Sequence, residues 1–275
     1  MNNAPIGVFD SGLGGLTVAR AIMDKLPSED IIYLGDTANT PYGPRPIAEV
    51  RELTLAGLDA LVEQGVKALV VACNTATAAA LADARERYWG VLGFAVVEVV
   101  TPAAQAAAAI TRNQNVGVIG TETTVRSHVY PSALAAVPGL EVSQQACPAF
   151  VEFVERGITT GDELVAITKE YLAPIKEAEV DTLILGCTHY PLLTGVLSRE
   201  MGPSVALVSS SEAAARSAYS TLVDLDLLHS VEPGKEGTLR MLTTEPSERF
   251  ETLARRFLGP RVKELESVQT AKGGE

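Results

Sequence analysis

The chain has 275 residues and 47% of them are hydrophobic, which is enough for one large core or for two smaller ones. A formal charge of −12 at pH 7 and the lack of any basic run argue against nucleic acid and anionic membranes as partners. No stretch has the roughly 18 consecutive apolar residues of a membrane span. The start Met-Asn-Asn-Ala-Pro also lacks the features of a signal peptide, so we expect a cytoplasmic protein.

Strand and helix patterns alternate from the N-terminus onward. Apolar runs predict strands at 6–9, 31–34, 68–72 and 94–100, and apolar residues at helical spacing predict helices from the glycine-rich turn 12–15 to about 26, at 47–62 and at 76–88. Proline and glycine are so dense in 40–46 that this stretch is expected to be a loop. Such alternation is typical of a mostly parallel sheet with helices on its faces.

The pattern then restarts near residue 116. The segment 116–121 resembles 6–11, and Gly117 precedes Cys187 by nearly the same spacing as Gly7 precedes Cys73. Two strand–turn–helix signals and two strand–cysteine signals at matched spacing indicate duplicated halves. We therefore expect two similar doubly wound α/β domains, related by pseudo-two-fold symmetry, with the active site in the cleft between them.

The remaining elements follow from local signals. A helix is predicted at 162–178 with Asp162 as its N-cap, and Pro174 predicts that it kinks or ends early. We expect a strand at 205–208, a helix from Ser209 to about 222, a loop at 224–237, a strand at 239–243, a helix at 249–258 and disorder from 270 to 275.

Two of the three cysteines end apolar runs in the same way. Cys73 follows the strand 68–72, Cys187 follows the strand 182–186, and each is followed by small polar residues and a helical pattern. The carboxyl ends of parallel strands are where open α/β sheets bind ligands. A single cysteine in this position is more often a small core residue, but two at matched positions indicate a shared site. A helix N-terminus behind each sulfur would favour the thiolate, and two opposed thiols suit a reaction that removes a proton from one face of a carbon and returns it to the other.

Other polar residues at the strand ends complete this hypothesis. His189 is a candidate proton partner for Cys187, and Asp10 is one for Cys73. The turn after Asp10 fails the dinucleotide fingerprint because Thr17 stands where a third glycine belongs. Cys187 and His189 could share a metal ion, but no third ligand is evident, so we expect none. Cys147 lies outside the repeated pattern and is interpreted as a packing residue.

Four segments together resemble the glutamate racemase family. They are Gly7–Val18, Gly35–Gly43, Ala72–Ala78 and Gly186–Leu193, and the resemblance runs from about residue 6 to residue 265. It implies interconversion of L- and D-glutamate without a cofactor, supplying D-glutamate for peptidoglycan, and a homodimer. It also places 1–98 with 208–268 in a first domain, 99–207 in a second domain, and 269–275 in a disordered tail.

The resemblance assigns roles to individual residues. Cys73 matches the family cysteine that deprotonates D-glutamate, and Cys187 matches the one that deprotonates L-glutamate. Asp10 and His189 match the assisting residues, and Glu155 matches an acid near the histidine. The implied substrate contacts are Asp10, Ser11, Tyr42, Gly43, Asn74, Thr75, Thr121, Thr188 and His189. The family often has proline where Glu152 stands, so the local charge there differs.

Three alternatives stay open on the sequence. An activity like that of the related aspartate racemases would use the same two cysteines. A thiol hydrolase or amidase would use Cys187 as nucleophile with His189 and would leave Cys73 without a role. A regulatory binding protein with a racemase-like fold would need neither thiol.

Overall fold

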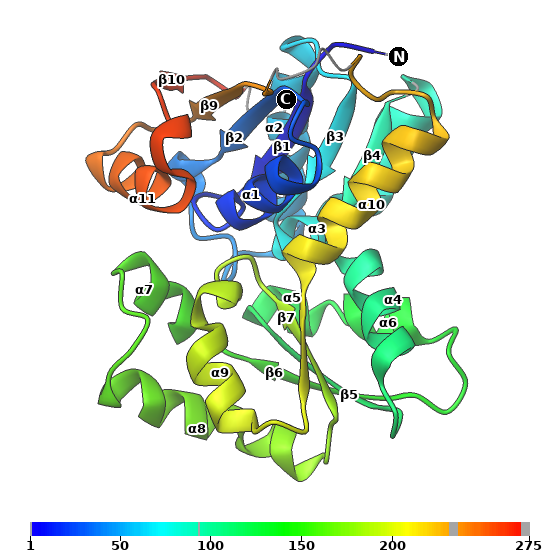
Figure 1. The fold of residues 1–275 in the computed structure, drawn as a ribbon, viewed down its shortest axis with the longest axis vertical. Coiled ribbons are helices and arrows are strands. Elements are labelled where there is room, and N and C mark those ends of the chain that lie inside the picture. Colours follow the sequence, from blue (N-terminus) through cyan, green and yellow to red (C-terminus); the bar gives the residue numbers. More distant parts are fainter. Residues whose placement is uncertain (1, 93, 231–235, 271–275) are drawn as a thin grey trace.

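The computed structural model describes residues 2–92, 94–230 and 236–270 of the chain. It contains two α/β domains, each built on a parallel sheet, which lie one above the other in Figure 1. The predicted fold class is therefore confirmed. The predicted disordered tail falls mainly on residues 271–275, which lie outside the described residues.

The first domain is built on a sheet that has six strands in the described residues, in the order β10-β9-β2-β1-β3-β4. Its strands are β1 (Ile6–Asp10), β2 (Ile31–Gly35), β3 (Ala68–Val71), β4 (Ala95–Glu98), β9 (Leu239–Thr243) and β10 (Leu265–Ser267), all paired in parallel. The helices are α1 (Leu16–Lys25), α2 (Ile47–Glu63), α3 (Asn74–Ala84), α10 (Ser210–Asp224) and α11 (Glu248–Leu258). Short 3₁₀ helices cover Thr37–Asn39 and Gly259–Arg261, and a π-helix covers Arg85–Val91.

The second domain is built on a smaller parallel sheet, with four strands in the described part of the chain and the order β6-β5-β7-β8. Its strands are β5 (Asn115–Gly120), β6 (Glu141–Ala146), β7 (Thr182–Gly186) and β8 (Ala206–Ser209). Its helices are α4 (Val100–Ile110), α5 (Glu122–Arg126), α6 (Val129–Leu134), α7 (Ala149–Glu155), α8 (Asp162–Glu177) and α9 (Thr194–Met201). Strand β8 continues to Ser209, slightly past residue 207, where the second domain was predicted to end; the domain boundaries stay a prediction.

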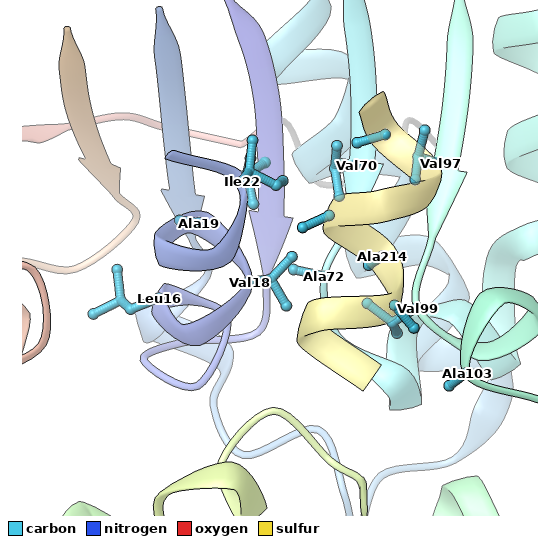
Figure 2. Close-up of a cluster of buried hydrophobic side chains, with 14 of the residues drawn as sticks. Leu16, Val18, Ala19, Ile22, Val70, Ala72, Val97, Val99, Ala103 and Ala214 are labelled. Atoms are coloured by element: carbon cyan, nitrogen blue, oxygen red, sulfur yellow. The ribbon is translucent and has the colours of Figure 1, made fainter. Parts of the chain in front are cut away.

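Helices cover both faces of each sheet, as expected for strands that are apolar on both sides. In the first domain α1, α10 and α11 pack on one face, and α2 and α3 pack on the other. Figure 2 shows part of the first of these layers, a buried cluster that includes Leu16, Val18, Ala19 and Ile22 of α1, Ala214 of α10, and Val70, Ala72 and Val97. The same hydrophobic cluster continues through α4 to Val116 and Val118 of β5, so one core links the two domains.

The strand order repeats between the domains. The run β2-β1-β3-β4 in the first sheet corresponds to β6-β5-β7-β8 in the second. Gly7 pairs with Leu69 on β3, and Gly117 pairs with Leu183 on β7, so the glycines occupy equivalent registers. Cys73 and Cys187 therefore follow equivalent strands at equivalent positions, as the duplicated pattern predicts.

Four local predictions differ from the structure. The strand predicted at 94–100 ends at Glu98, because the Glu98 carboxylate accepts hydrogen bonds from the backbone N–H of Val100 and of Thr101 at 3.1 Å and so begins α4. Pro174 lies inside α8, which continues to Glu177 rather than ending early. The N-cap of α8 is Gly161 instead of Asp162.

The fourth difference concerns the segment after Cys187. No α-helix begins at its sulfur: a turn leads into the 3₁₀ helix Tyr190–Leu193, and α9 begins only at Thr194. The helix N-terminus predicted behind each sulfur is therefore present at Cys73 alone. Separately, none of the helices in the described residues is long and apolar enough to cross a membrane.

Candidate active site

A cavity of about 220 Å³ lies between the two domains, at the carboxyl ends of β1, β3, β5 and β7. The predicted site residues that line it are Ser11, Tyr42, Gly43, Cys73, Asn74, Thr75, Thr121, Glu155, Cys187, Thr188 and His189. Asp10 does not line the cavity; it is fully buried at the end of β1. The two sheets thus bring nearly all the predicted residues to one site between the domains, of a size suited to a small molecule.

Cys73 lies at the start of a helix, where its sulfur acts as a cap. It is the N-cap residue of α3, and its Sγ accepts a hydrogen bond from the backbone N–H of Ala76 at 3.4 Å. The sulfur also lies 3.5 Å from Oγ of Ser11. Burial and the nearby charge of Asp10 raise the pKa of the Cys73 thiol to about 12. Cys73 is therefore protonated at neutral pH and can serve as an acid.

Asp10 is a buried carboxyl group whose charge affects both the Cys73 thiol and the His189 imidazole. Its Oδ1 accepts a hydrogen bond from the backbone N–H of Gly12 at 3.0 Å, whereas its Oδ2 has no hydrogen-bond partner among the described residues. Burial raises the pKa of Asp10, although the charge of His189 opposes this. Asp10 thus lies behind the cavity wall, where its carboxyl group influences the electrostatics of both Cys73 and His189.

Cys187 has a different partner. Its sulfur lies 3.8 Å from Nδ1 of His189, and Nε2 of the same ring lies 3.5 Å from Oε1 of Glu155. Burial alone would lower the pKa of His189, but its contacts with Cys187 and Glu155 and the charge of Asp10 raise that pKa to about 10. The imidazole is therefore positively charged at neutral pH, and its charge lies beside the sulfur of Cys187.

The glycine-rich turn after β1 lies directly against this histidine. A Cβ at Gly14 would collide with Oγ1 of Thr188 and would lie 2.5 Å from Nδ1 of His189. Thr17, at the start of α1, bonds through its Oγ1 to the backbone carbonyl of Thr188 at 3.0 Å. Because only glycine allows this approach, the turn fixes the Thr188–His189 segment from the opposite domain.

Hydroxyl and amide groups from both domains meet beside Cys73. Oγ1 of Thr75 lies 2.9 Å from Oγ1 of Thr121. The Tyr130 hydroxyl donates to Oδ1 of Asn74 at 2.6 Å, and Nδ2 of Asn74 lies 3.4 Å from Oγ of Ser210. Sequence reasoning missed Tyr130 and Ser210, and neither carries a local signal, because only the packing of the domains brings them to Asn74.

The charge of the cavity wall is unusual for an anion site. Glu122, Glu152 and Glu155 line it, and among the described residues no lysine or arginine does. The described residues also contain no cluster of three or more His, Cys, Asp or Glu side chains that could hold a metal ion. Cys147 does not line the cavity and is fully buried in a core cluster with Phe150 and Tyr190, in agreement with its predicted packing role.

Comparison with known proteins gives a consistent result. A family model described as Asp/Glu/Hydantoin racemase matches residues 16–218. A glutamate racemase of Beutenbergia cavernae is 55% identical, covering 99% of this chain and 96% of that protein. The crystal structure of a glutamate racemase isoform from Bacillus anthracis is 38% identical with a TM-score of 0.91, covering 98% of each chain. The glutamate racemase from Francisella tularensis in complex with D-glutamate is 33% identical with a TM-score of 0.90, covering 98% of this chain and 99% of that one.

Proposed function

The chain belongs to the Asp/Glu/hydantoin racemase family, and we propose that it exchanges the α-proton of glutamate between Cys73 and Cys187. It is an isomerase that racemises glutamate, as are the relatives that match it at 51–56% identity over nearly its whole length. One observation carries the two-thiol mechanism. The two cysteines follow equivalent strands of two similar domains and line one cavity, so a bound substrate meets one sulfur from each domain.

The two thiols have different surroundings, which suit them to different roles. Cys187 lies beside a charged imidazole, so it is the base that removes the α-proton of L-glutamate. Cys73, whose pKa burial and Asp10 raise to about 12, is the acid that supplies a proton to the opposite face. After one turnover to D-glutamate, Cys187 holds the proton taken from the substrate and Cys73 has given up its own proton. The reverse reaction returns both thiols to their starting states.

The transition state carries negative charge on the substrate carboxylate, and the site offers fixed donors for it. The α3 N-terminus begins at Asn74, and the hydroxyls of Thr75 and Thr121 lie beside it. Donors that are already oriented in an enclosed site stabilise such charge without reorganising. The absence of a lysine or arginine from the described cavity wall makes these neutral donors the substrate's main partners.

Four further parts belong to the proposal. The family resemblance implies that the D-glutamate serves peptidoglycan synthesis and that the enzyme works as a homodimer, and the sequence features lead us to expect that it acts in the cytoplasm. It needs no cofactor, because the two thiols supply both proton transfers.

The test is incubation with L- or D-glutamate in deuterated water without any added cofactor. We expect racemisation, with α-deuterium entering the product because the new proton comes from a solvent-exchanged thiol. Cys73→Ala and Cys187→Ala are each expected to abolish turnover. A thiol hydrolase would need Cys187 alone and would show no α-exchange. A folded wild-type protein that neither racemises glutamate nor exchanges its α-proton would contradict the proposal.

A further inference from the structure

A loop of the first domain covers the cavity. Residues 40–46 connect the 3₁₀ helix Thr37–Asn39 to α2, and Thr40, Pro41, Tyr42, Gly43 and Pro44 all line the cavity wall. A ligand bound there contacts this loop on one side and the second domain on the other. The position of the loop relative to the second domain therefore decides whether the site is open or closed.

One residue of the second domain is bonded to this loop. Thr123 on α5 donates its backbone N–H to the carbonyl of Gly43 at 3.2 Å. Its hydroxyl Oγ1 lies 2.8 Å from the same carbonyl and 3.0 Å from the carbonyl of Arg45. Thr123 itself is only 3% exposed, whereas Gly43 and Arg45 are half-buried, so these contacts lie at the edge of the interface between the loop and the second domain.

The loop is held to its own domain by separate bonds. The Tyr42 hydroxyl donates to Oδ2 of Asp36 at 2.6 Å, and Nε of Arg45 donates to the carbonyl of Asn39 at 2.8 Å. None of these bonds crosses to the second domain. The loop can therefore move with the first domain when its bonds to Thr123 break.

The outer side of the loop leaves room for such a movement. A second, open crevice lies there, lined by Pro44, Pro46, Ile47, Thr123, Arg126 and Ser127. Thr123 lines this crevice, and Pro44 of the loop lines both the crevice and the site cavity. The backbone N–H of Thr123 and its single hydroxyl proton, shared between two carbonyls, therefore hold the part of the loop that lies between the two spaces.

We propose that Thr123 is a positioning residue that latches the loop 40–46 closed over the site, and that its hydroxyl controls how readily solvent reaches Cys73 and Cys187. The effect of this latch on glutamate turnover rests on the proposed function. With a weaker latch Tyr42 and Gly43 hold the substrate less firmly and water enters more often, so KM rises and kcat falls to a smaller degree.

The first measurement does not depend on activity. Iodoacetamide alkylation of the three cysteines is followed separately by peptide mass spectrometry in the wild type, Thr123→Val and Thr123→Ser. We expect Thr123→Val to speed labelling of Cys73 and Cys187 about five- to tenfold, the change in an opening equilibrium that loss of one hydrogen bond gives. Cys147, which is buried outside the cavity, is expected to react at the wild-type rate. Thr123→Ser keeps the hydroxyl and should resemble the wild type.

Thr54→Val is the matched control. Thr54 is also fully buried in a helix, but its hydroxyl bonds only to the carbonyl of Val50 in the same helix, at 2.7 Å. The Thr54→Val variant should be less stable than the wild type, but its Cys73 and Cys187 should be labelled at the wild-type rate. If Thr123→Val does not fold, Thr123→Ala serves the same comparison.

The labelling rates of the three cysteines distinguish the latch from its alternatives. Faster labelling of Cys73 and Cys187 alone, with a several-fold higher KM for glutamate, supports the latch. Faster labelling without any racemase activity in the wild type keeps the latch and removes the proposed function. Unchanged labelling in Thr123→Val, or an equal rise at all three cysteines, overturns the latch, the second because it reports general loosening.

Discussion

The imidazole of His189 lies between the sulfur of Cys187 and the carboxylate of Glu155, 3.8 Å from the first and 3.5 Å from the second. This arrangement gives the two thiols of the site different partners. Cys187 lies beside the charged imidazole of His189, which is itself paired with Glu155. Cys73 instead lies near the buried carboxyl group of Asp10. The domains are similar in topology, yet the charged groups beside their two thiols differ, and the proposed division of roles between the thiols depends on this difference.

Glu155→Gln should narrow the pH range of activity from its alkaline side. The pKa of His189 is raised to about 10, so the imidazole loses its proton only near that pH in the native protein. Removing the carboxylate partner lowers this pKa, by about one unit or more for the loss of a close opposite charge. Because the proposed mechanism uses the charged imidazole beside Cys187, activity should fall as the imidazole loses its proton, and the alkaline limb of the kcat/KM profile should move to lower pH in the variant.

Glu152→Gln is the control for this measurement. Glu152 also lines the cavity, lies one helical turn before Glu155 on α7 and carries the same charge. Its side chain is exposed, so its charge is screened by water. An alkaline limb that moves equally in both variants would mean that Glu155 acts only through the general field of the cavity.

Gly14→Ala should impair catalysis strongly while the fold persists. The new methyl group would collide with the Thr188 hydroxyl and crowd Nδ1 of His189, so the imidazole must move away from Cys187. A displacement of about 1 Å in a catalytic group costs on the order of 100-fold in rate, and we expect kcat/KM to fall by at least that factor. Circular dichroism would establish that the protein remains folded.

Gly195→Ala provides the comparison for Gly14→Ala. Gly195 lies in α9, and beyond the adjacent backbone of its own helix no described atom lies within 4 Å of a Cβ built there. Alanine is a better helix former than glycine, by up to about 1 kcal/mol, so this variant should be slightly more stable and fully active. Equal activity in the two alanine variants would show that the Thr188–His189 segment adapts easily.

The parts of the fold that were predicted from the sequence are those with a sharp local contrast. The strands before both cysteines are apolar runs that stop at a polar residue, and their repetition revealed the two domains. Helix α4 was not predicted, because its buried residues Val100, Ala103, Ala104 and Ala107 have alanine for most of their neighbours and no polar face sets them apart. Strand β6, Glu141–Ala146, was missed because it is a polar, half-exposed edge strand without an apolar run.

The residues of the site also fall into those that local sequence could identify and those that it could not. Residues next to the strand ends, such as Cys73 and His189, could be found because local sequence places them at the cleft. Tyr130 and Thr123 reach the site only through the packing of one domain on the other, with partners that are distant in the sequence. No periodicity or motif encodes such contacts, so they became visible only in three dimensions.

Cys147→Ala should lower stability and leave turnover within a few-fold of the wild type. Cys147 is fully buried, and burial raises the pKa of its thiol, which keeps it protonated. The Tyr190 hydroxyl bonds to the backbone carbonyl of Cys147 at 2.8 Å, and that bond survives the substitution. Loss of the sulfur should cost about 1 kcal/mol, comparable to removing one buried methyl group. Denaturant unfolding and a racemisation assay measure the two effects, and a folded but inactive variant would assign Cys147 a role in the reaction.

Separating the roles of Cys73 and Cys187 requires a reaction that runs in one direction only. L- and D-glutamate are mirror images and equally stable in water, so kcat/KM for racemisation is the same in both directions for any variant. A glutamate analogue with a leaving group on the carbon next to the α-carbon avoids this limit. One base removes the α-proton, the electron pair forms a double bond, and the leaving group departs, so the opposite thiol is not needed.

Cys73→Ser and Cys187→Ser should therefore show opposite preferences for the enantiomers of such an analogue. Serine is far too weakly acidic to act as the resting base, whereas the remaining cysteine still can. Cys73→Ser should eliminate from the L-analogue through Cys187 and fail with the D-analogue, and Cys187→Ser should do the reverse. Cys147→Ser should process both, as the wild type does. Elimination from both enantiomers by either single variant would show that one thiol reaches both faces of the α-carbon, and the assignment of one face to each domain would then be wrong.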